Sequence, residues 1–197
     1  MAKTDDVAAA ILSATGEVTT MKLQKLLYYS QAWHLTFTGT PLFPSEVQAW
    51  LQGPVVPDIH RQVRRRYFVA GLPSGDATAL SESERRTIEW VLGKYGSFTA
   101  EALSAMTHLE SPWRLARGIA GDDEATDTPI SHDVMASYYG RQRSSPNVAV
   151  AQVAASAALE GELLDQGWHD VLLAVANDER SADSVVAEEI ARARRQG

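Results

Sequence analysis

The strongest hydrophobic pattern in this chain lies between Leu23 and Phe37, where apolar or aromatic residues occupy nearly every helical position. Two stripes there follow the helical period of about 3.6 residues, namely Leu23, Leu27, Ser30 and His34, and Leu26, Tyr29, Trp33 and Phe37. A helix that is apolar on more than one face normally packs on several sides at the centre of a domain. We therefore predict a central hydrophobic helix at about residues 21–37, with its charges near its start at Lys22 and Lys25 and with Thr19 or Thr20 as N-cap.

Capping residues predict further helices on either side of this central helix. Asp5 or Asp6 is placed to cap a first helix, and Gly16 can close that helix in the left-handed conformation. Asp58 is a suitable N-cap for a helix that runs to Phe68. The chain before the central helix and the chain after residue 58 are therefore both expected to be helical.

Prolines interrupt the segment between these helices. Because Pro44, Pro54 and Pro57 remove backbone donors and fix the backbone, residues 42–58 cannot form one long helix. Val47–Leu51 fits a short strand or a helical turn, and the sequence does not distinguish between the two. A short strand pair near residues 46–56 is one expectation.

The second half of the chain repeats helix-start signals. Ser81 is followed by Glu84 three residues later, which is a capping box. Thr99 is placed to start the next helix, Ser111–Pro112 has the pattern of an N-cap followed by proline, and Ser131 can cap a further short helix. The pattern as a whole predicts a mainly α fold, a compact multi-helix domain around the central helix.

A polar, proline-containing break at Arg141–Asn147 is the strongest boundary signal. We predict a domain at residues 1–140 and a helical C-terminal extension at residues 141–197, with helices at Val148–Leu164, Val171–Ala176 and Ser184–Arg195. The last helix has only a narrow apolar stripe. Such a segment either packs back on its domain or binds a partner.

Composition narrows the class of protein. The chain has 197 residues, of which 45% are hydrophobic, and it contains no cysteine, which excludes disulfides, thiolate nucleophiles and cysteine-ligated zinc. It has no apolar run of the roughly 20 residues that a membrane-spanning helix needs. We therefore expect a soluble cytoplasmic protein. The formal net charge of −7 argues against sequence-independent binding to nucleic acid.

The sequence contains no pattern typical of an enzyme. Nucleophile-elbow, phosphate-loop and dinucleotide motifs are absent, and no two of the five histidines have a helical metal-ligand spacing. His108 and Glu110 lie close enough in sequence for an acid–base pair, but we favour a role for Thr107, Glu110 and Ser111 in capping helix ends. We predict no catalytic, cofactor or metal site.

One dense basic cluster, which contains Arg61, Arg64, Arg65 and Arg66, is a candidate for partner binding. Charge runs are usually solvated faces, and that interpretation is weighed equally with a docking patch for an acidic partner. His34 is more simply a buried or half-buried imidazole than a functional group. The candidate partner-binding residues are Arg61, Arg64, Arg65, His34, Trp50 and Val55.

Five blocks of sequence follow one another along the chain: MKLQKLLYYSQAWHL, PLF, VQAWLQGPVVPDIHRQ, LSAMTHLESPWRLAR and the PIS that precedes the last short helix. In order and spacing these blocks resemble the Panacea domain, also known as the SocA-like or phage-associated domain of bacterial antitoxins. The resemblance covers about residues 5–139. It implies an antitoxin, encoded beside its toxin, that neutralises a cognate protein toxin by protein–protein contact rather than by catalysis.

The resemblance brings no catalytic residues with it. Its signature positions, which serve either as scaffold or as contact surface, are Lys25, Tyr28, Tyr29, Trp50, Gly53, Pro54, Val55, His108, Glu110, Pro112 and Trp113. Two other roles remain open: an adaptor that delivers the toxin to a protease, and a DNA-binding autoregulator of its own operon. Residues 148–196 lie outside the resemblance, and we hypothesise that they add toxin-specific contacts.

Overall fold

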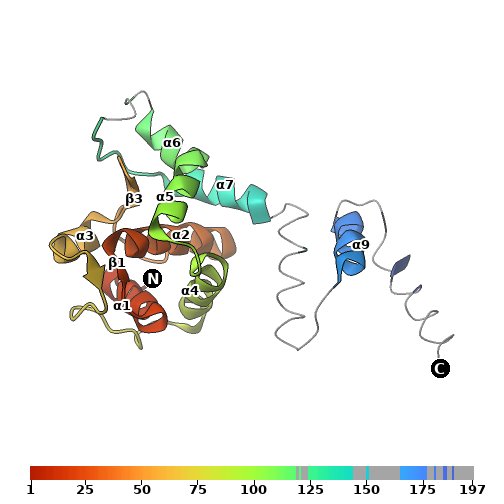
Figure 1. The fold of residues 1–197 in the computed structure, drawn as a ribbon, viewed down its shortest axis with the longest axis horizontal. Coiled ribbons are helices and arrows are strands. Elements are labelled where there is room, and N and C mark those ends of the chain that lie inside the picture. Colours follow the sequence, from red (N-terminus) through yellow and green to blue (C-terminus); the bar gives the residue numbers. More distant parts are fainter. Residues whose placement is uncertain are drawn as a thin grey trace. The chain divides into compact units, whose positions relative to one another are not determined.

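A computed structural model describes residues 1–118, 120, 124–143, 150, 165–176, 180, 184–185 and 188, and the chain divides into two compact units, Met1–Tyr139 and Gly140–Gly197. The helices are α1 (Thr4–Thr15), α2 (Thr20–Thr38), α3 (Pro57–Val63), α4 (Glu82–Tyr95), α5 (Ala100–Leu109), α6 (Ser111–Arg117), α7 (His132–Arg143) and α9 (Gln166–Ala176) (Figure 1). Two short antiparallel pairs accompany them, β1 (Val18–Thr19) with β4 (Phe68–Val69) and β2 (Gln48–Trp50) with β3 (Gly53–Val55). The predicted mainly α class is confirmed.

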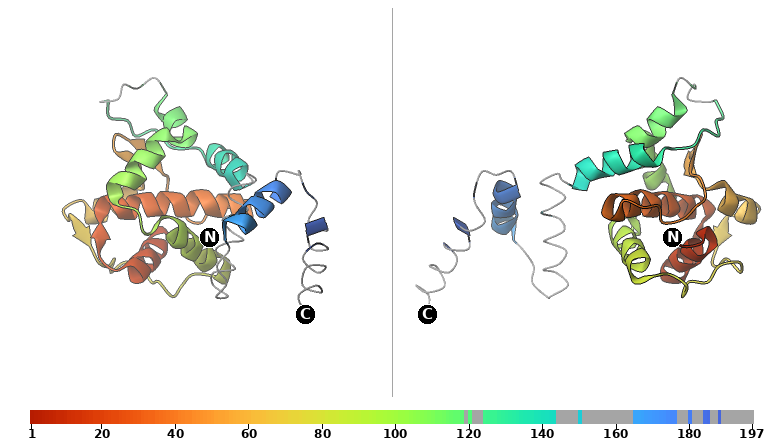
Figure 2. Two further views of the ribbon diagram at one scale, coloured as in Figure 1. Left: turned by 45° about the vertical axis from the view of Figure 1, so that its right-hand side comes forward. Right: turned by 180° about the vertical axis from the view of Figure 1, so that it is seen from behind.

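Helix α2 is the centre of the first unit, as the hydrophobic pattern predicted. Every residue from Leu23 to Leu35 is buried. Helices α1 and α4 lie on one side of α2, and α5, α6 and α7 lie on the other (Figures 1 and 2). Thr19 is the N-cap and accepts a hydrogen bond from the Lys22 amide, and Gly39 closes the helix at a φ of 74°. Because α2 is covered on several sides, it carries apolar residues on more than one face.

The segment that the sequence left undecided is a strand hairpin formed by β2 and β3. Gly53 lies at the start of β3 with a φ of 97°, a conformation that side chains disfavour. A Cβ atom at this position would lie 2.8 Å from both Lys25 Nζ and Thr107 Oγ1. Glycine therefore lets the hairpin approach α2 and α5 closely.

The prediction of a helix from Asp58 to Phe68 was wrong at both ends. Helix α3 starts at Pro57 and ends at Val63. Asp58 therefore lies in its first turn and is not its N-cap. Thr20 binds the segment that follows α3. Its Oγ1 donates to the Arg66 carbonyl at 2.7 Å, and its amide donates to the Tyr67 carbonyl at 2.9 Å. These contacts place Phe68 in β4, beside β1, instead of in a helix.

Two predicted N-caps also need correction. Lys3, not Asp5 or Asp6, precedes α1, and no side chain caps that helix. Asp6 instead accepts a hydrogen bond from the Asp76 amide at 2.9 Å, which ties α1 to the loop before α4. Helix α6 begins at Ser111, so Ser111 is its first residue and not its cap.

The C-terminal unit contains α9, which begins five residues before the predicted start at Val171. The predictions of helices at residues 148–164 and 184–195 fall almost wholly outside the described residues. Among the helices of the described part of the chain, none combines the length and the apolar character needed to cross a membrane.

The predicted capping box at the start of α4 is confirmed, and its contribution can be measured. Ser81 Oγ accepts from the Glu84 amide, and the Glu84 carboxylate accepts from the Ser81 amide at 2.8 Å. We expect Ser81→Ala to lower the free energy of unfolding by about 1 kcal/mol, because one amide of the first turn loses its acceptor. Ser81→Gly should cost only a few tenths of that amount, since glycine leaves this amide open to water. Urea titrations of both variants test this, and equal losses would contradict the capping role.

Candidate partner-binding groove

Residues from the sequence blocks meet in one network between α2, the β2–β3 hairpin and the α5–α6 corner. Lys25 Nζ donates to the Pro54 carbonyl at 3.2 Å, and Trp113 Nε1 donates to the Trp50 carbonyl at 3.0 Å. The His108 ring stacks on Trp113, with ring centroids 4.2 Å apart. These contacts connect the hairpin to α2 through Lys25 and to the α5–α6 corner through Trp113.

A second part of the same network is a buried carboxylate surrounded by tyrosines. Glu110 is 6% exposed and accepts hydrogen bonds from the Tyr139 hydroxyl at 2.6 Å and from the Tyr29 hydroxyl at 3.2 Å. The Tyr28 and Tyr139 hydroxyls lie 3.2 Å apart. Burial raises the pKa of Glu110 from 4.5 to about 7. These contacts join α2, α7 and the α5–α6 corner, and they give Glu110 a place in the core instead of at a surface.

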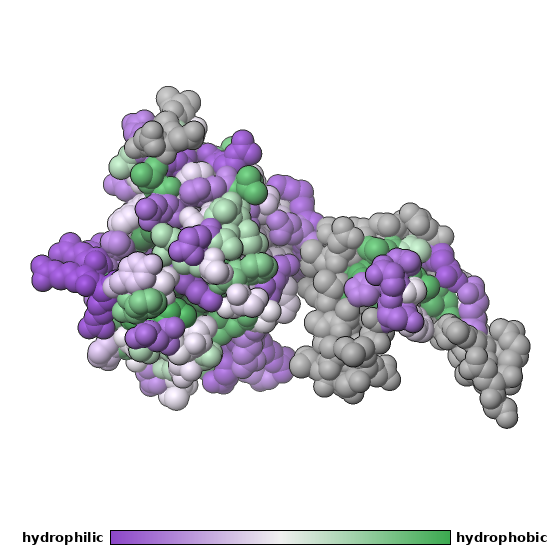
Figure 3. Space-filling model, viewed as in Figure 1, coloured by the Kyte–Doolittle hydropathy of each residue, from purple (hydrophilic) through white to green (hydrophobic). Residues whose placement is uncertain are grey.

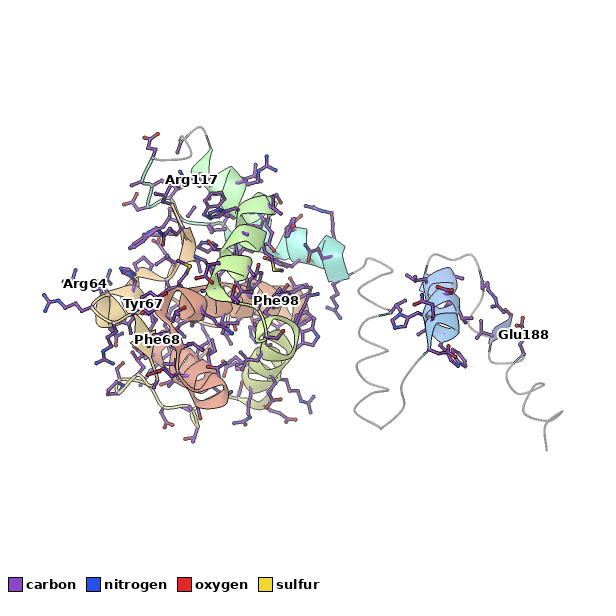
Figure 4. All side chains as sticks on the ribbon, in the orientation of Figure 1. Arg64, Tyr67, Phe68, Phe98, Arg117 and Glu188 are labelled. Atoms are coloured by element: carbon purple, nitrogen blue, oxygen red, sulfur yellow. The ribbon has the colours of Figure 1, made fainter. Side chains whose placement is uncertain are left out.

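A groove of about 450 Å³ opens where the start of α2, the hairpin, the end of α3 and the start of α5 come together. Its lining residues are Thr19, Thr20, Met21, Gln24, Lys25, Trp50, Leu51, Gln52, Val55, His60, Arg64, Arg66, Tyr67, Ala100 and Glu101. Arg64, Tyr67 and Phe68 lie together at this side of the unit, near α3 (Figure 4). Hydrophobic and polar residues are interspersed over this face (Figure 3).

The floor of the groove presents hydrogen-bond donors that are nearly inaccessible to water. Lys25 is 1% exposed, and its one hydrogen bond among the described residues is to the Pro54 carbonyl. Gln24 Oε1 accepts from the Val56 amide at 2.7 Å, which fixes the orientation of the side-chain amide. Gln24 Nε2 then has no partner within the described residues. Burial lowers the pKa of Lys25 to about 7.

The rim of the groove combines arginines with exposed apolar and aromatic side chains. Arg64 and Arg66 are exposed, Tyr67 is 72% exposed, and Leu51 is also exposed. On the inner wall, the Trp50 ring lies edge-on to the His60 ring, with centroids 4.8 Å apart. Exposed aromatic residues beside arginine are the composition that protein interfaces favour.

Three of the six candidate partner-binding residues, Trp50, Val55 and Arg64, line the groove. Arg61 and Arg65 are exposed but lie outside the lining, and Arg61 forms an ion pair with Asp58. His34 is 4% exposed, and its Nδ1 lies 2.9 Å from Thr87 Oγ1 inside the unit. Its burial removes His34 from the candidate surface, as the alternative of a buried imidazole had anticipated.

The sequence did not single out Tyr67 or Gln24 as candidate site residues. Arg66 already belonged to the basic cluster, and Lys25 to the signature positions of the resemblance. Tyr67 was hidden because the segment was interpreted as a helix with Phe68 on its apolar face. The adjacent aromatic pair Tyr67–Phe68, directly after an arginine run, was the available signal for an exposed strand end. Within the described residues, no group of three or more histidine, aspartate or glutamate side chains is arranged to hold a metal ion.

Comparison with known families supports the resemblance seen in the sequence. The model of the family described as "Antitoxin SocA-like, Panacea domain" matches residues 23–114. The matched range starts in α2, contains the β2–β3 hairpin and ends in α6, so it includes most of the groove lining and of the hairpin-fastening network. No curated protein and no solved structure matched the chain. Residues 23–114 of this chain are thus similar to the Panacea domain of SocA-like antitoxins.

Proposed function

We propose that this protein is an antitoxin that neutralises a cognate protein toxin by direct binding, and that the groove is part of the contact surface. The family match at residues 23–114 is the observation that carries the proposal. The groove supports it, because Trp50, Arg64 and Tyr67 are of the residue types that most often dominate protein–protein binding energy.

The surroundings of two buried charged residues, Lys25 and Glu110, also favour binding over catalysis. Lys25 and Glu110 have strongly shifted pKa values, which elsewhere can mark catalytic groups. Glu110, however, is held among tyrosine hydroxyls in the core, and Lys25 supports the hairpin through the Pro54 carbonyl. Both groups serve the architecture that presents the groove.

The proposal is tested with the product of the neighbouring gene. That product is expressed alone and together with this protein, growth is scored, and the complex is purified. We expect toxicity alone, rescue by co-expression and co-purification of the two chains. A harmless neighbour would remove the support for an antitoxin role. Rescue of growth without a stable complex would favour the adaptor role instead, provided that the rescue is lost in a protease-deficient host.

We also propose that residues 141–197 add toxin-specific contacts. This part of the chain follows the Panacea domain and includes α9, whose described residues carry Trp168 at 36% exposure. Deleting residues 140–197 should weaken toxin binding and neutralisation. A shortened chain that ends at Tyr139 and binds the toxin at full strength would contradict this assignment.

A further inference from the structure

We infer that the groove binds an aspartate or glutamate side chain of the partner toxin, carried on a segment with apolar neighbours. This inference deepens the proposed function and rests on it. It assigns the groove a ligand chemistry, a carboxylate held by Lys25, Gln24, Arg64 and Arg66, with the flanking apolar side chains against Trp50 and Val55.

The floor of the groove is the first reason. A buried ammonium group has three donors, and within the described residues Lys25 uses one of them, on the Pro54 carbonyl. Gln24 contributes a further donor, the unpartnered Nε2, from a side chain that is itself buried. Unsatisfied buried donors cost free energy, and an acceptor brought by a ligand recovers that cost on binding. An anionic acceptor recovers the most, because it also favours the charged form of Lys25 and makes that hydrogen bond charge-assisted.

The backbone adds positive potential at the same place. Helix α2 begins at the groove through Thr19, Thr20 and Met21, and α5 begins there through Ala100 and Glu101. Each helix N-terminus carries about half a positive charge from its aligned peptide dipoles. Both ends therefore favour an anion in the groove, in addition to the side-chain donors of the floor.

The charges and apolar residues of the rim favour a carboxylate over a nucleic acid as the bound anion. Arg64 and Arg66 are the exposed cations of the lining, against one acid, Glu101, so the groove is positive in a chain whose net charge is −7. A nucleic acid would meet the repulsion of that net charge over its whole length. A single carboxylate on an apolar segment matches both the local charge and the apolar wall of Trp50, Leu51 and Val55. The volume of about 450 Å³ fits a few side chains.

The test compares two double charge reversals in the full-length protein. Arg64→Glu with Arg66→Glu changes the groove, whereas Arg61→Glu with Arg65→Glu makes the same charge change on exposed arginines outside it. The dissociation constant for the purified toxin is measured by titration calorimetry, and thermal melting verifies folding. We expect the groove variant to bind about 100-fold more weakly and the control variant to bind within about threefold of the wild type.

Two results would overturn the inference while leaving the antitoxin role intact. One is neutralisation and binding by the groove variant at wild-type strength. The other is an equal loss in both double variants, which would indicate long-range attraction and not a site. If the wild-type protein itself fails to bind or neutralise the toxin, the proposed function fails, and this inference fails with it. If the wild type binds promoter DNA and only the groove variant loses that binding, the groove is a nucleic-acid site.

Proton uptake gives an independent readout at the floor. A carboxylate beside Lys25 favours the charged amine, so binding at pH 8 should take up a proton that the free protein lacks. The groups that face Lys25 or share the groove are His60, Arg64 and Arg66 from the α3 side, and Glu101 and His108 from α5. The binding enthalpy is compared in buffers of different ionisation enthalpy for the wild type and Lys25→Met. Equal proton uptake by the two proteins would overturn the contact with Lys25.

The partner's acid can then be identified by charge exchange. Aspartates and glutamates of the toxin are changed to arginine one at a time, and each variant is titrated with the Arg64→Glu, Arg66→Glu protein. We expect one toxin variant to regain at least about tenfold in affinity for the groove variant while losing affinity for the wild type. If no exchange restores binding, the groove does not hold a toxin carboxylate.

Discussion

Replacing Trp33 with alanine should lower the free energy of unfolding by about 3–5 kcal/mol, because it opens a large cavity at the centre of the first unit. Trp33 lies on α2, is fully buried, and packs its ring against Trp90 at 4.4 Å and Tyr139 at 5.2 Å between centroids. Its Nε1 also donates to the Tyr95 hydroxyl at 3.0 Å, so the variant leaves that buried hydroxyl without its partner.

The measurement is urea unfolding followed by far-UV circular dichroism, since the substitution removes a fluorophore. Trp168→Ala is the matched control, because this tryptophan belongs to α9 in the other unit and is partly exposed. We expect the control to leave the main unfolding transition within about 0.5 kcal/mol of the wild type. A loss below about 1 kcal/mol for Trp33→Ala would mean that α2 is not the centre of the core.

The central helix that carries Trp33 could be predicted because its sequence signal is local. The pattern of this helix is local, since nine of the fifteen residues from Leu23 to Phe37 are apolar or aromatic and they lie on more than one face. A helix that is covered on several sides accommodates that pattern. The capping box at Ser81 and Glu84 was equally local, and it was predicted correctly. Signals of this kind are complete within a few residues.

The elements that were mispredicted depend on contacts between distant residues. The chain after α3 extends because Thr20, more than forty residues earlier, binds the carbonyls of Arg66 and Tyr67. The groove had the same limitation. The helical pattern placed Lys25 only among the charges at the start of a helix, and it did not predict that the hairpin at Gly53 covers this side chain. No short sequence window contains both partners of such a contact.

Glu110 provides the second large prediction, a pH dependence of stability. Its pKa is about 7 in the folded protein, because burial disfavours the carboxylate, against 4.5 for an ordinary glutamate. Below pH 4.5 the group is protonated in both states. As the pH rises from 4.5 to 7, the unfolded chain releases the proton first, so stability is lost over this window. The contribution to the free energy of unfolding amounts to about 3 kcal/mol.

Glu110→Gln isolates this contribution, because the amide stays neutral at every pH. The wild type should lose about 3 kcal/mol relative to the glutamine variant between pH 4.5 and pH 8. Urea titrations of both proteins at several pH values give the difference. Glu101→Gln, an exposed glutamate on α5, is the control for removing one carboxylate. A difference between wild type and Glu110→Gln that stays constant with pH would contradict the raised pKa of Glu110.

The tyrosines around Glu110 make the direction of a further change predictable. The Tyr139 hydroxyl donates to the carboxylate at 2.6 Å and so stabilises its charged form, which lowers the pKa of Glu110 against the effect of burial. In Tyr139→Phe that stabilisation is lost, and the window over which stability falls should extend to higher pH than in the wild type. A window that moves to lower pH would mean that Tyr139 does not donate to this carboxylate. The same titrations therefore test the hydrogen bond that connects α7 to the α5–α6 corner.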